Sequence, residues 1–224
     1  MKVSIVIAVL ESREVLKRQT RYFRGLELPK DTEIIIVDDG SDPPLEVDVE
    51  PQNFSLIQTN DFRPWSQPCA RNFGAEYAKG EYLLMTDIDH MLSREAIEDV
   101  RNFSGDKMMF PRHWAILDAE GKIVQDKERL FEYGLSEELY EKRGLHAGHH
   151  ANTFAMRKRI YEELDGYNEK FCGKYGGDDT DFSRRYGQHH YSGKCERHRM
   201  GSRIYVYPDP RRDKKKVFHS LRYK

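Results

Sequence analysis

The sequence predicts an α/β protein built on a mostly parallel sheet that helices cover on both faces. Two observations support this fold class. Residues 3–9 (VSIVIAV) and 33–37 (EIIIV) are continuous apolar runs rich in β-branched side chains, which is the pattern of strands buried on both faces. Strand-like and helix-like segments then alternate as far as residue 103, as they do in folds made of strand–helix–strand units.

The first half of the chain follows this alternation closely. Residues 11–26 carry apolar side chains at a spacing that suits a helix, and the segment ends before Pro29. Residues 68–79 predict a second helix, because Pro68 lies at its start and Gly80 follows its end. The other elements expected here are a strand at 54–58, a strand at 81–86 and a helix capped by Ser93 that ends near residue 103.

The second half is less regular. It contains no internal repeat and no low-complexity linker, and a basic segment closes the chain. The expected strands lie within 113–117, 121–124, 151–156 and 203–208, and the expected helices lie within 136–143, 157–164 and 175–187. With 224 residues, the chain is long enough for one domain with a sizeable core.

Composition argues against several classes of protein. Charged residues make up 33% of the chain but the formal net charge is only -1, which disfavours a dedicated nucleic-acid binder. The longest apolar run, residues 3–10, is far shorter than a membrane span, and no small-x-small cleavage site follows it, so we interpret it as a strand. Cys69, Cys172 and Cys195 are too few and too scattered for a disulfide framework, which predicts a reducing, cytoplasmic compartment.

Acidic residues follow two of the predicted strands at the point where each strand ends. Asp39 follows the second strand, and Asp87 and Asp89 follow the fourth. Ligands of open parallel sheets bind outside the carboxyl ends of the strands, so these acids are expected to face one crevice. Because residues i and i+2 of an extended chain point the same way, Asp87 and Asp89 would converge, and their oxygens would suit Mg²⁺ or Mn²⁺. The alternative is that these acids only cap the turns into the next helices.

Several motifs occur in an order that is found in one group of enzymes. VSIVIAV, IIIVDDGSD, ARNFGAEYAKGEYLLMTDID and GGDDTDFSRRY together resemble the GT-A fold glycosyltransferases of the family 2 type, over roughly residues 1–190. The segment DGYNEKFCGKYGGDDTDFSRRY also resembles the carboxyl-terminal half of the β-1,4-galactosyltransferases and the polypeptide N-acetylgalactosaminyltransferases. The resemblance implies a single GT-A domain over residues 1–224, with a nucleotide-binding half (1–90), an acceptor and catalytic half (91–210) and a basic tail (211–224).

The resemblance assigns the donor side of the site to the first half. Asp39 would bind the uracil or ribose of the nucleotide, and Arg71 of the ARN segment would lie near the nucleotide. Asp87 and Asp89 match the D-x-D motif, with Asp89 as the direct ligand of Mn²⁺ or Mg²⁺. The chain departs from the family at Ala8, the first of four positions where the family usually has Pro-Thr-Tyr-Asn. Ala8 is expected to border the nucleotide, but the aromatic side chain that stacks on the base in the family is missing.

The resemblance assigns the acceptor side to the segment GGDDTDF. Asp179 matches the general base of inverting members, and Asp178 replaces an acid that contacts the acceptor or the sugar in relatives. The acceptor hydroxyl must lose a proton as it attacks, and the glycines let the backbone approach a sugar closely. If both aspartates lie where a helix begins, the helix dipole favours their ionised form. The alternative is a plain acidic N-cap.

A histidine near the end of the chain is expected to complete the metal site. In the galactosyl- and N-acetylgalactosaminyltransferases that the chain resembles, this ligand follows a late strand, and His219 takes that place here. His90 is the rival, but its side chain is expected to point to the opposite face of an extended segment. An ordinary tail histidine is the alternative for His219. Three further histidines, His146, His149 and His150, could line the acceptor pocket or lie in a solvated loop.

These inferences predict a metal-dependent glycosyltransferase of the hexosyl or N-acetylhexosaminyl type. It would move a sugar from a nucleoside-diphosphate sugar, with a UDP-sugar as the expected donor, to an acceptor hydroxyl with inversion. The acceptor stays open among a glycan, a lipid-linked saccharide, a protein side chain and a modified nucleic-acid base. A haloacid dehalogenase-type phosphatase is one alternative, although it places D-x-D on its first strand and has Thr or Val where this chain has Met91. A non-catalytic module that binds nucleotide sugars is the other, and intact Asp89 and Asp179 count against it.

Overall fold

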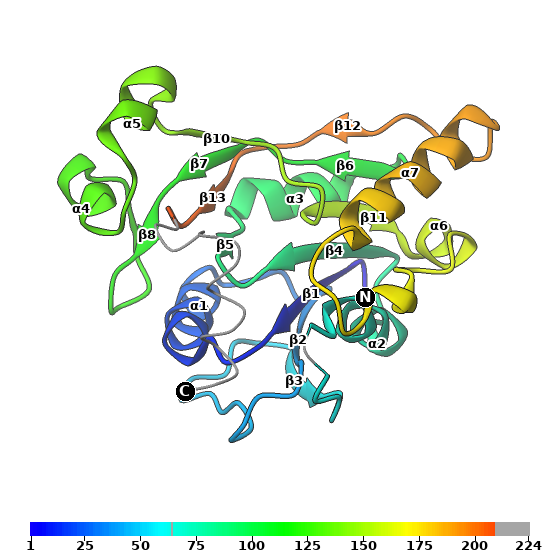
Figure 1. The fold of residues 1–224 in the computed structure, drawn as a ribbon, viewed down its shortest axis with the longest axis horizontal. Helices are drawn as coiled ribbons and strands as arrows, with labels where there is room; N and C mark the ends of the chain where they lie inside the picture. The colour runs from blue at the N-terminus through cyan, green and yellow to red at the C-terminus, as the bar shows by residue number, and fades with distance from the viewer. Residues whose placement is uncertain (64, 209–224) are drawn as a thin grey trace.

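A computed structural model of the chain describes residues 1–63 and 65–208. Its largest sheet contains seven strands, which are β1 (Val3–Val9), β2 (Thr32–Asp38), β3 (Phe54–Gln58), β4 (Tyr82–Asp87), β6 (Lys107–Met109), β11 (Phe154–Arg157) and β12 (Arg199–Met200). Their order across the sheet is β12-β6-β11-β4-β1-β2-β3 (Figure 1). Strand β11 pairs antiparallel with β4 and β6, whereas the other neighbours pair in parallel. This mostly parallel sheet confirms the predicted fold class.

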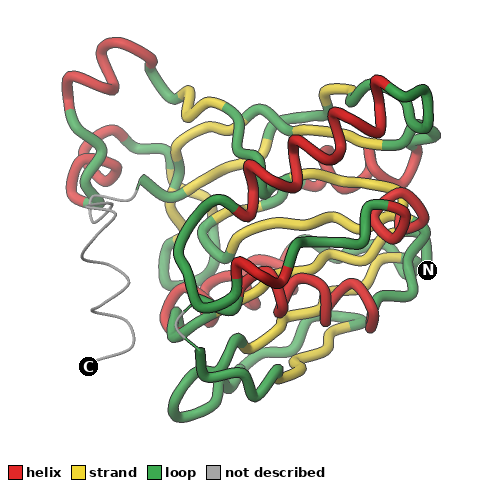
Figure 2. Tube along the Cα trace, turned by 45° about the vertical axis from the view of Figure 1, so that its right-hand side comes forward, coloured by secondary structure: helices red, strands yellow, loops and turns green. Residues whose placement is uncertain are grey.

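Helices cover both faces of this sheet (Figure 2). The described helices are α1 (Arg13–Gly25), α2 (Gln67–Tyr77), α3 (Arg94–Asn102), α4 (Lys127–Glu132), α5 (Glu137–Arg143), α6 (Lys158–Glu163) and α7 (Asp178–Tyr191), of which α4 and α5 lie away from this sheet (Figure 1). Side chains of α1 and α3 share one hydrophobic cluster with Ile5 and Ile7, and side chains of α2, α6 and α7 share the other with Val6 and Ala8. The two clusters alternate along β1 because successive side chains of a strand point to opposite faces.

A second, smaller sheet begins at the edge where β4 ends. Its four strands are β5 (His90–Met91), β7 (Arg112–Trp114), β10 (His146–Gly148) and β13 (Ile204–Val206), in the order β10-β7-β13-β5. A two-stranded ribbon, β8 (Ile116–Leu117) with β9 (Ile123–Val124), and a 3₁₀ helix, η1 (Glu169–Phe171), complete the described elements. Among residues 1–63 and 65–208, no helix has both the length and the apolar composition that a bilayer span requires.

The elements with the strongest sequence patterns lie where they are predicted. Strands β1 and β3 have the predicted bounds, and β2, β4, α1 and α2 differ from theirs by one or two residues at each end. Ser93 caps α3 as predicted, because its Oγ accepts a hydrogen bond from the Ala96 backbone N–H at 3.1 Å. The sequence does not predict β6, β10 or α4, whose lengths of 3, 3 and 6 residues are too short to show a hydrophobic period.

A glycine holds α2 close to the sheet. A Cβ atom at Gly74 would lie 2.5 Å from a side-chain carbon of Val6 and 2.9 Å from one of Val37, so a larger side chain would push the helix away. The ARN segment, Ala70 to Asn72, lies about one turn earlier in the same helix. The close approach therefore brings the polar side chains of this segment to the edge where β1, β2 and β4 end.

Candidate active site

The carboxyl ends of β1, β2 and β4 form the edge on which the candidate site is built. In the strand register, Ala8 of β1 lies between Val37 of β2 and Asp87 of β4. Asp39 follows β2 directly, is 3% exposed, and donates from its backbone N–H to the Val9 carbonyl at 2.8 Å. The two acidic strand ends thus lie on neighbouring parts of one sheet edge, as the sequence predicts.

The two acids after β2 have different surroundings. Asp38 closes the turn, because its Oδ1 accepts from the Ser41 backbone N–H at 2.9 Å and its Oδ2 accepts from the Leu45 N–H at 2.8 Å. Both carboxylate oxygens of Asp38 are therefore used to shape the loop. Asp39 is the acid of this pair that remains a candidate for binding a nucleotide.

Two side chains of α2 hold Asp87 at the end of β4. The Arg71 guanidinium donates to Asp87 Oδ1, and Gln67 Nε2 donates to the same oxygen at 3.1 Å. Arg71 is 1% exposed, and its Nη1 also donates to the Asn152 carbonyl at 3.1 Å and to the Tyr167 hydroxyl at 3.0 Å. Arg71 therefore orients the Asp87 carboxylate, which is a role that the sequence analysis does not assign to it. Its contact with a nucleotide stays a prediction.

Charge keeps the buried Arg71 ionised. Burial by itself lowers the pKa of a guanidinium, but Tyr167, Asp87 and Asp178 raise the pKa of Arg71 above its usual value. Asp87 ends β4 and Asp178 begins α7, so the two acids come from distant parts of the sequence. One buried cation thus lies within electrostatic reach of both the D-x-D motif and the Gly-Gly-Asp-Asp segment.

Replacing Arg71 with leucine is expected to lower the free energy of unfolding by about 3–5 kcal/mol, because it leaves the Asp87 carboxylate partly buried without its cation. Urea denaturation followed by circular dichroism measures this loss. Arg63→Leu is the matched control: Arg63 pairs with Asp61 at 2.6 Å but is 53% exposed, so its removal should cost about 1 kcal/mol or less. Equal losses for the two variants would show that the Arg71 pair is not a structural requirement.

The chain turns directly after Asp87, and the turn brings His90 to the carboxylates. Strand β4 ends at Asp87, the next two residues form the turn, and β5 begins at His90. His90 Nδ1 lies 2.9 Å from Asp89 Oδ1 and 3.9 Å from Asp87 Oδ2. The prediction that His90 points to the opposite face is therefore wrong, because it assumed an extended segment where the chain bends.

A histidine that follows β10 reaches the same acid. His150 Nδ1 lies 3.3 Å from Asp87 Oδ2. Burial lowers the pKa of His150 to about 4, although the Asp87 charge opposes this shift, so the imidazole is neutral near neutral pH. Asp87, His90 and His150 offer ligand atoms that all lie within 4.8 Å of one another, which is close enough to hold a cation. The sequence marks His150 only as one of three histidines near a possible acceptor pocket, because no spacing links it to D-x-D.

Asn72, the last residue of the ARN segment, ties α2 to the loop that leads toward α7. Its Nδ2 donates to the Tyr167 carbonyl and to Glu169 Oε1, both at 2.9 Å. Its Oδ1 accepts from the Tyr161 hydroxyl at 2.7 Å and from the Tyr167 backbone N–H at 2.8 Å. Neighbouring residues of one helix thus fix both halves of the candidate site, since Arg71 holds Asp87 and Asn72 holds the chain before α7.

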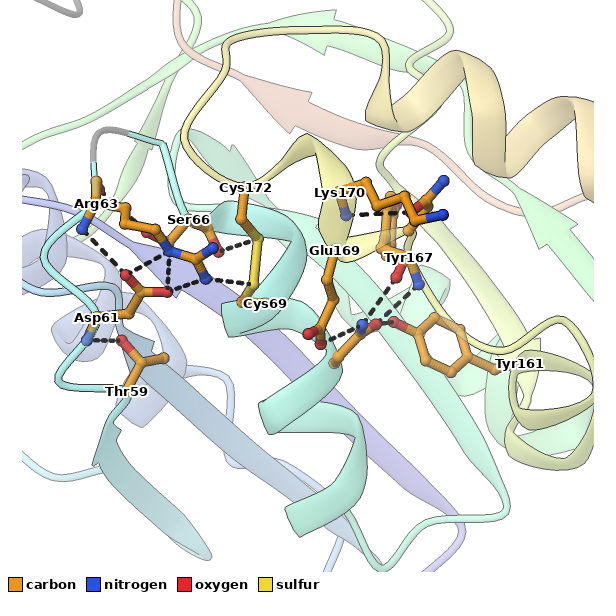
Figure 3. The surroundings of a disulfide bond; sticks show 12 residues. Thr59, Asp61, Arg63, Ser66, Cys69, Tyr161, Tyr167, Glu169, Lys170 and Cys172 are labelled. Atoms are coloured by element: carbon orange, nitrogen blue, oxygen red, sulfur yellow. Dashed lines mark hydrogen bonds and ion pairs between the residues drawn. A yellow bond between two sulfur atoms is a disulfide. The ribbon is translucent and has the colours of Figure 1, made fainter.

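A disulfide adds a covalent tie at the same place. Cys69 of α2 is bonded to Cys172 in the loop before α7 (Figure 3). The Gly173 backbone N–H donates to the Trp65 carbonyl at 2.7 Å, and the rings of Trp65 and Tyr175 meet edge to face with centroids 4.8 Å apart. The loop after Cys172 therefore lies against the start of α2.

This bond corrects the interpretation of the cysteines. The few, scattered cysteines predict no disulfide framework, yet Cys69 and Cys172 are paired across 103 residues, and Cys195 is a free thiol. Sequence distance misleads here because the fold brings α2 and the loop before α7 side by side. Cysteine spacing therefore no longer supports a reducing, cytoplasmic compartment.

Helix α7 begins directly after a glycine pair. Gly176 and Gly177 have φ values of 85° and 92°, a left-handed conformation that favours glycine. Asp179 is half-buried in the first turn of α7, and its Oδ1 accepts from the Thr180 backbone N–H at 2.7 Å. The segment predicted to begin a helix with acidic residues does so.

Asp178 is more enclosed than the sequence analysis expects. It is 2% exposed, and burial raises the pKa of its carboxyl group, while the Arg71 cation opposes part of the shift. Burial of Asp178 therefore opposes the effect that the helix start is predicted to have on its ionisation. His219, the expected additional metal ligand, and the basic tail lie outside the described residues.

A model of the family described as glycosyl transferase family 2 matches residues 4–165 of the chain. The chain belongs to glycosyl transferase family 2. The matched range runs from β1 past the end of α6 and includes the D-x-D motif, whereas Asp178 and Asp179 lie beyond it. No curated protein sequence matches this family 2 chain.

Solved structures of S. aureus TarS share the GT-A fold of this family 2 chain. TarS 1-349 in complex with UDP-GlcNAc has a TM-score of 0.58 and 15% identity, and the match covers 99% of this chain and 64% of that one. TarS 1-349 in complex with UDP has a TM-score of 0.56 and 17% identity, with 94% and 61% covered. Longer TarS gives a TM-score of 0.58 and 15% identity, with 94% and 37% covered. The family 2 chain thus spans less than two thirds of each TarS chain, and identity this low shows the fold alone.

Proposed function

We propose that this family 2 chain transfers a sugar from a UDP-sugar to an acceptor hydroxyl with inversion, and that Mn²⁺ or Mg²⁺ binds at its D-x-D motif. The observation that carries this proposal is the position of Arg71 between two acidic motifs. It donates to Asp87 of D-x-D and lies within electrostatic reach of Asp178 of Gly-Gly-Asp-Asp. A donor site and an acceptor site that must react with each other need such proximity.

The donor would lie along the edge formed by β1, β2 and β4. Ala8 and Asp39 are both at this edge, and ligands of open α/β sheets bind outside the carboxyl ends of the strands. Asp39 would accept hydrogen bonds from the uracil or the ribose, as the family resemblance implies. The TarS complexes with UDP and with UDP-GlcNAc support a uridine nucleotide as the first donor to test.

The side chains around D-x-D suit a hard divalent cation. Asp87 Oδ2 and the Asp89 carboxylate are oxygen donors, and His150 Nδ1 is a neutral nitrogen donor close to Asp87. A cation held there would supply Lewis-acid stabilisation of the charge that develops on the leaving diphosphate. Arg71 and Gln67 keep the Asp87 carboxylate in position whether or not a cation is bound.

Asp179 would act as the general base. The acceptor oxygen attacks the anomeric carbon of the donor, and its proton passes to the Asp179 carboxylate. The bond between the anomeric carbon and the diphosphate oxygen breaks, and its electron pair leaves with UDP. A single displacement of this kind inverts the anomeric centre. Asp178 would have a different role, which is contact with the acceptor or the sugar, as the family resemblance implies.

The remaining alternatives differ in what supports them. The phosphatase alternative is wrong, because the chain belongs to family 2 and its D-x-D follows β4 rather than the first strand. The resemblance of the later segment to the galactosyl- and N-acetylgalactosaminyltransferases rests on the sequence alone, and the disulfide removes the cysteine argument for a cytoplasmic location. Asp178 and Asp179 at the start of α7 are the observation that favours an enzyme over a non-catalytic module.

A donor screen tests the proposed function. UDP-GlcNAc, UDP-glucose, UDP-galactose and UDP-GalNAc are each incubated with the chain and Mn²⁺, and both binding and slow release of UDP are measured. Transferases hydrolyse a matching donor slowly when no acceptor is present, so at least one donor is expected to release UDP above the rate without protein. If a donor binds but no UDP is released, even after saccharide acceptors are added, the result would support the non-catalytic module instead.

A further inference from the structure

The structure distinguishes the roles of the two histidines beside D-x-D. His90 and His150 both lie near Asp87, with ring centroids 5.5 Å apart. An imidazole can bind a cation only through a nitrogen that carries no proton. The hydrogen bonds around each ring therefore decide which of the two can be a ligand.

Arg112 fixes the protonation of His90. Arg112 Nη1 lies 2.8 Å from His90 Nε2, and a guanidinium has donors but no acceptor, so Nε2 must accept. In the neutral ring the proton is then on Nδ1, which lies 2.9 Å from Asp89 Oδ1, at ion-pair distance but not aligned as a hydrogen bond. A ring bound to metal through Nδ1 would carry its proton on Nε2, directly against the guanidinium. His90 thus orients Asp89 and has no lone pair to offer a cation.

The same arginine fixes the segment that carries the second histidine. Arg112 is 6% exposed, and its Nε donates to the Gly148 carbonyl at 2.9 Å. Its Nη2 donates to the Ala147 carbonyl at 3.3 Å and to the His149 carbonyl at 3.2 Å. Three consecutive carbonyls just before His150 are therefore held by one buried side chain, which limits where the His150 ring can lie.

The contact between His150 and Asp87 has the spacing of two ligands of one cation. Adjacent ligands lie about 3.0 Å apart when each is about 2.1 Å from a six-coordinate cation, and His150 Nδ1 lies 3.3 Å from Asp87 Oδ2. The pair is not aligned as a hydrogen bond, and the buried Nδ1 of His150 has no hydrogen-bond partner among the described residues. Asp87 Oδ1 is already used by Arg71 and Gln67, which leaves Oδ2 to face the histidine.

We propose that His150 supplies the imidazole ligand of the divalent cation at D-x-D, and that His90 and Arg112 position Asp89 and the 147–149 segment around it. Asp87 Oδ2 and His150 Nδ1 would hold the cation, the Asp89 carboxylate would join them from the turn as the D-x-D motif implies, and water or a diphosphate would fill the other positions. This inference rests on the proposed function only for the presence of a cation. It replaces His219 with a histidine that follows β10 and lies within the described residues.

Electron spin-echo spectroscopy of bound Mn²⁺ tests this assignment, because a directly coordinated imidazole nitrogen modulates the echo. The chain is loaded with Mn²⁺ alone and then with Mn²⁺ and UDP. Modulation of the echo by nitrogen is expected in the unaltered chain. Its frequencies should change when histidine is labelled with ¹⁵N, because the two isotopes differ in nuclear spin. His150→Asp keeps an oxygen ligand for Mn²⁺ and should lose the modulation. His146→Asn changes an exposed histidine of β10, the strand that precedes His150, and should keep the modulation.

The outcomes separate the ligand assignment from the proposed function. Modulation that persists in His150→Asp, or a chain that binds no Mn²⁺ with or without UDP, would overturn the assignment. His90→Asn, provided that it folds, should weaken Mn²⁺ binding by roughly 10–100-fold, as loss of a residue that orients a ligand does, but should retain the nitrogen modulation. If modulation depends on His150 while no donor is turned over, the metal site stands and the proposed function fails. If a donor is turned over without nitrogen modulation, the proposed function stands and the assignment of His150 as a ligand fails.

Discussion

Replacing Asp179 with asparagine is expected to lower the rate of sugar transfer by roughly 10²–10⁴-fold and to leave donor affinity nearly unchanged. Asparagine has nearly the same shape as aspartate and can still accept the hydrogen bond from the Thr180 backbone N–H. It cannot take the proton of the acceptor hydroxyl. The change therefore removes the general base and leaves the donor edge at β1, β2 and β4 intact.

The rate of product formation and the affinity for UDP should be measured on the same preparations. Asp181→Asn is the matched control. Asp181 belongs to the same turn of α7, but its carboxylate accepts hydrogen bonds from Arg184 and Arg185 at 2.8 Å each. It should keep a rate close to that of the unaltered chain. The anomer of the product, read by NMR, gives an independent check. A product that retains the donor configuration would contradict the role of Asp179.

Removal of the divalent cation is expected to abolish transfer, and Mn²⁺ or Mg²⁺ should restore it. A Lewis acid contributes several kcal/mol to stabilising a leaving diphosphate, which corresponds to a loss of at least about 100-fold in rate. Asp89→Asn should produce a loss of similar size at ordinary metal concentrations, because it removes a carboxylate from the cation. The measurement is turnover after treatment with a chelator, followed by stepwise addition of each metal.

Asp61→Asn serves as the control for the change at Asp89. Asp61 also pairs with a basic residue, Arg63, but it lies on a loop next to the disulfide (Figure 3) and not at the D-x-D motif. Its replacement should leave the metal requirement unchanged. Full turnover in the presence of excess chelator would end the metal hypothesis and would leave the general-base prediction standing.

The sequence predicts the fold class well because the information for it is local. β1, β2 and β4 are nearly continuous apolar runs, and a strand buried on both faces requires that composition wherever it lies. The acids at the strand ends can be placed for the same reason, since the end of each run is visible in the sequence. Asp39 and Asp87 thus lie on one edge as expected.

The sequence fails where distant segments meet. His150 reaches Asp87 only because β10 pairs with β7, and β10 is too short to show a pattern. The burial of Asp178 comes from packing around α7, so its raised pKa has no local signal. His90 illustrates a smaller failure, because Asp89 is interpreted as a ligand in an extended segment, although aspartate is also a common turn residue. The ARN segment could be recognised as a motif from the sequence. Its contacts with Asp87 and with the chain before α7 depend on the fold and could not be predicted.

Because Cys69 and Cys172 form a disulfide, the way in which a sample is produced and stored can change the result of a measurement on it. A reducing agent added for storage, or production inside a reducing cell, can yield the same polypeptide with this bond open. The loop after Cys172 would then keep only non-covalent ties to α2, such as the hydrogen bond from the Gly173 N–H to the Trp65 carbonyl. Two batches of equal purity could differ in acceptor KM for this reason alone. Thiol titration and intact mass should accompany each kinetic assay, so that a difference between laboratories is not mistaken for a difference between substrates.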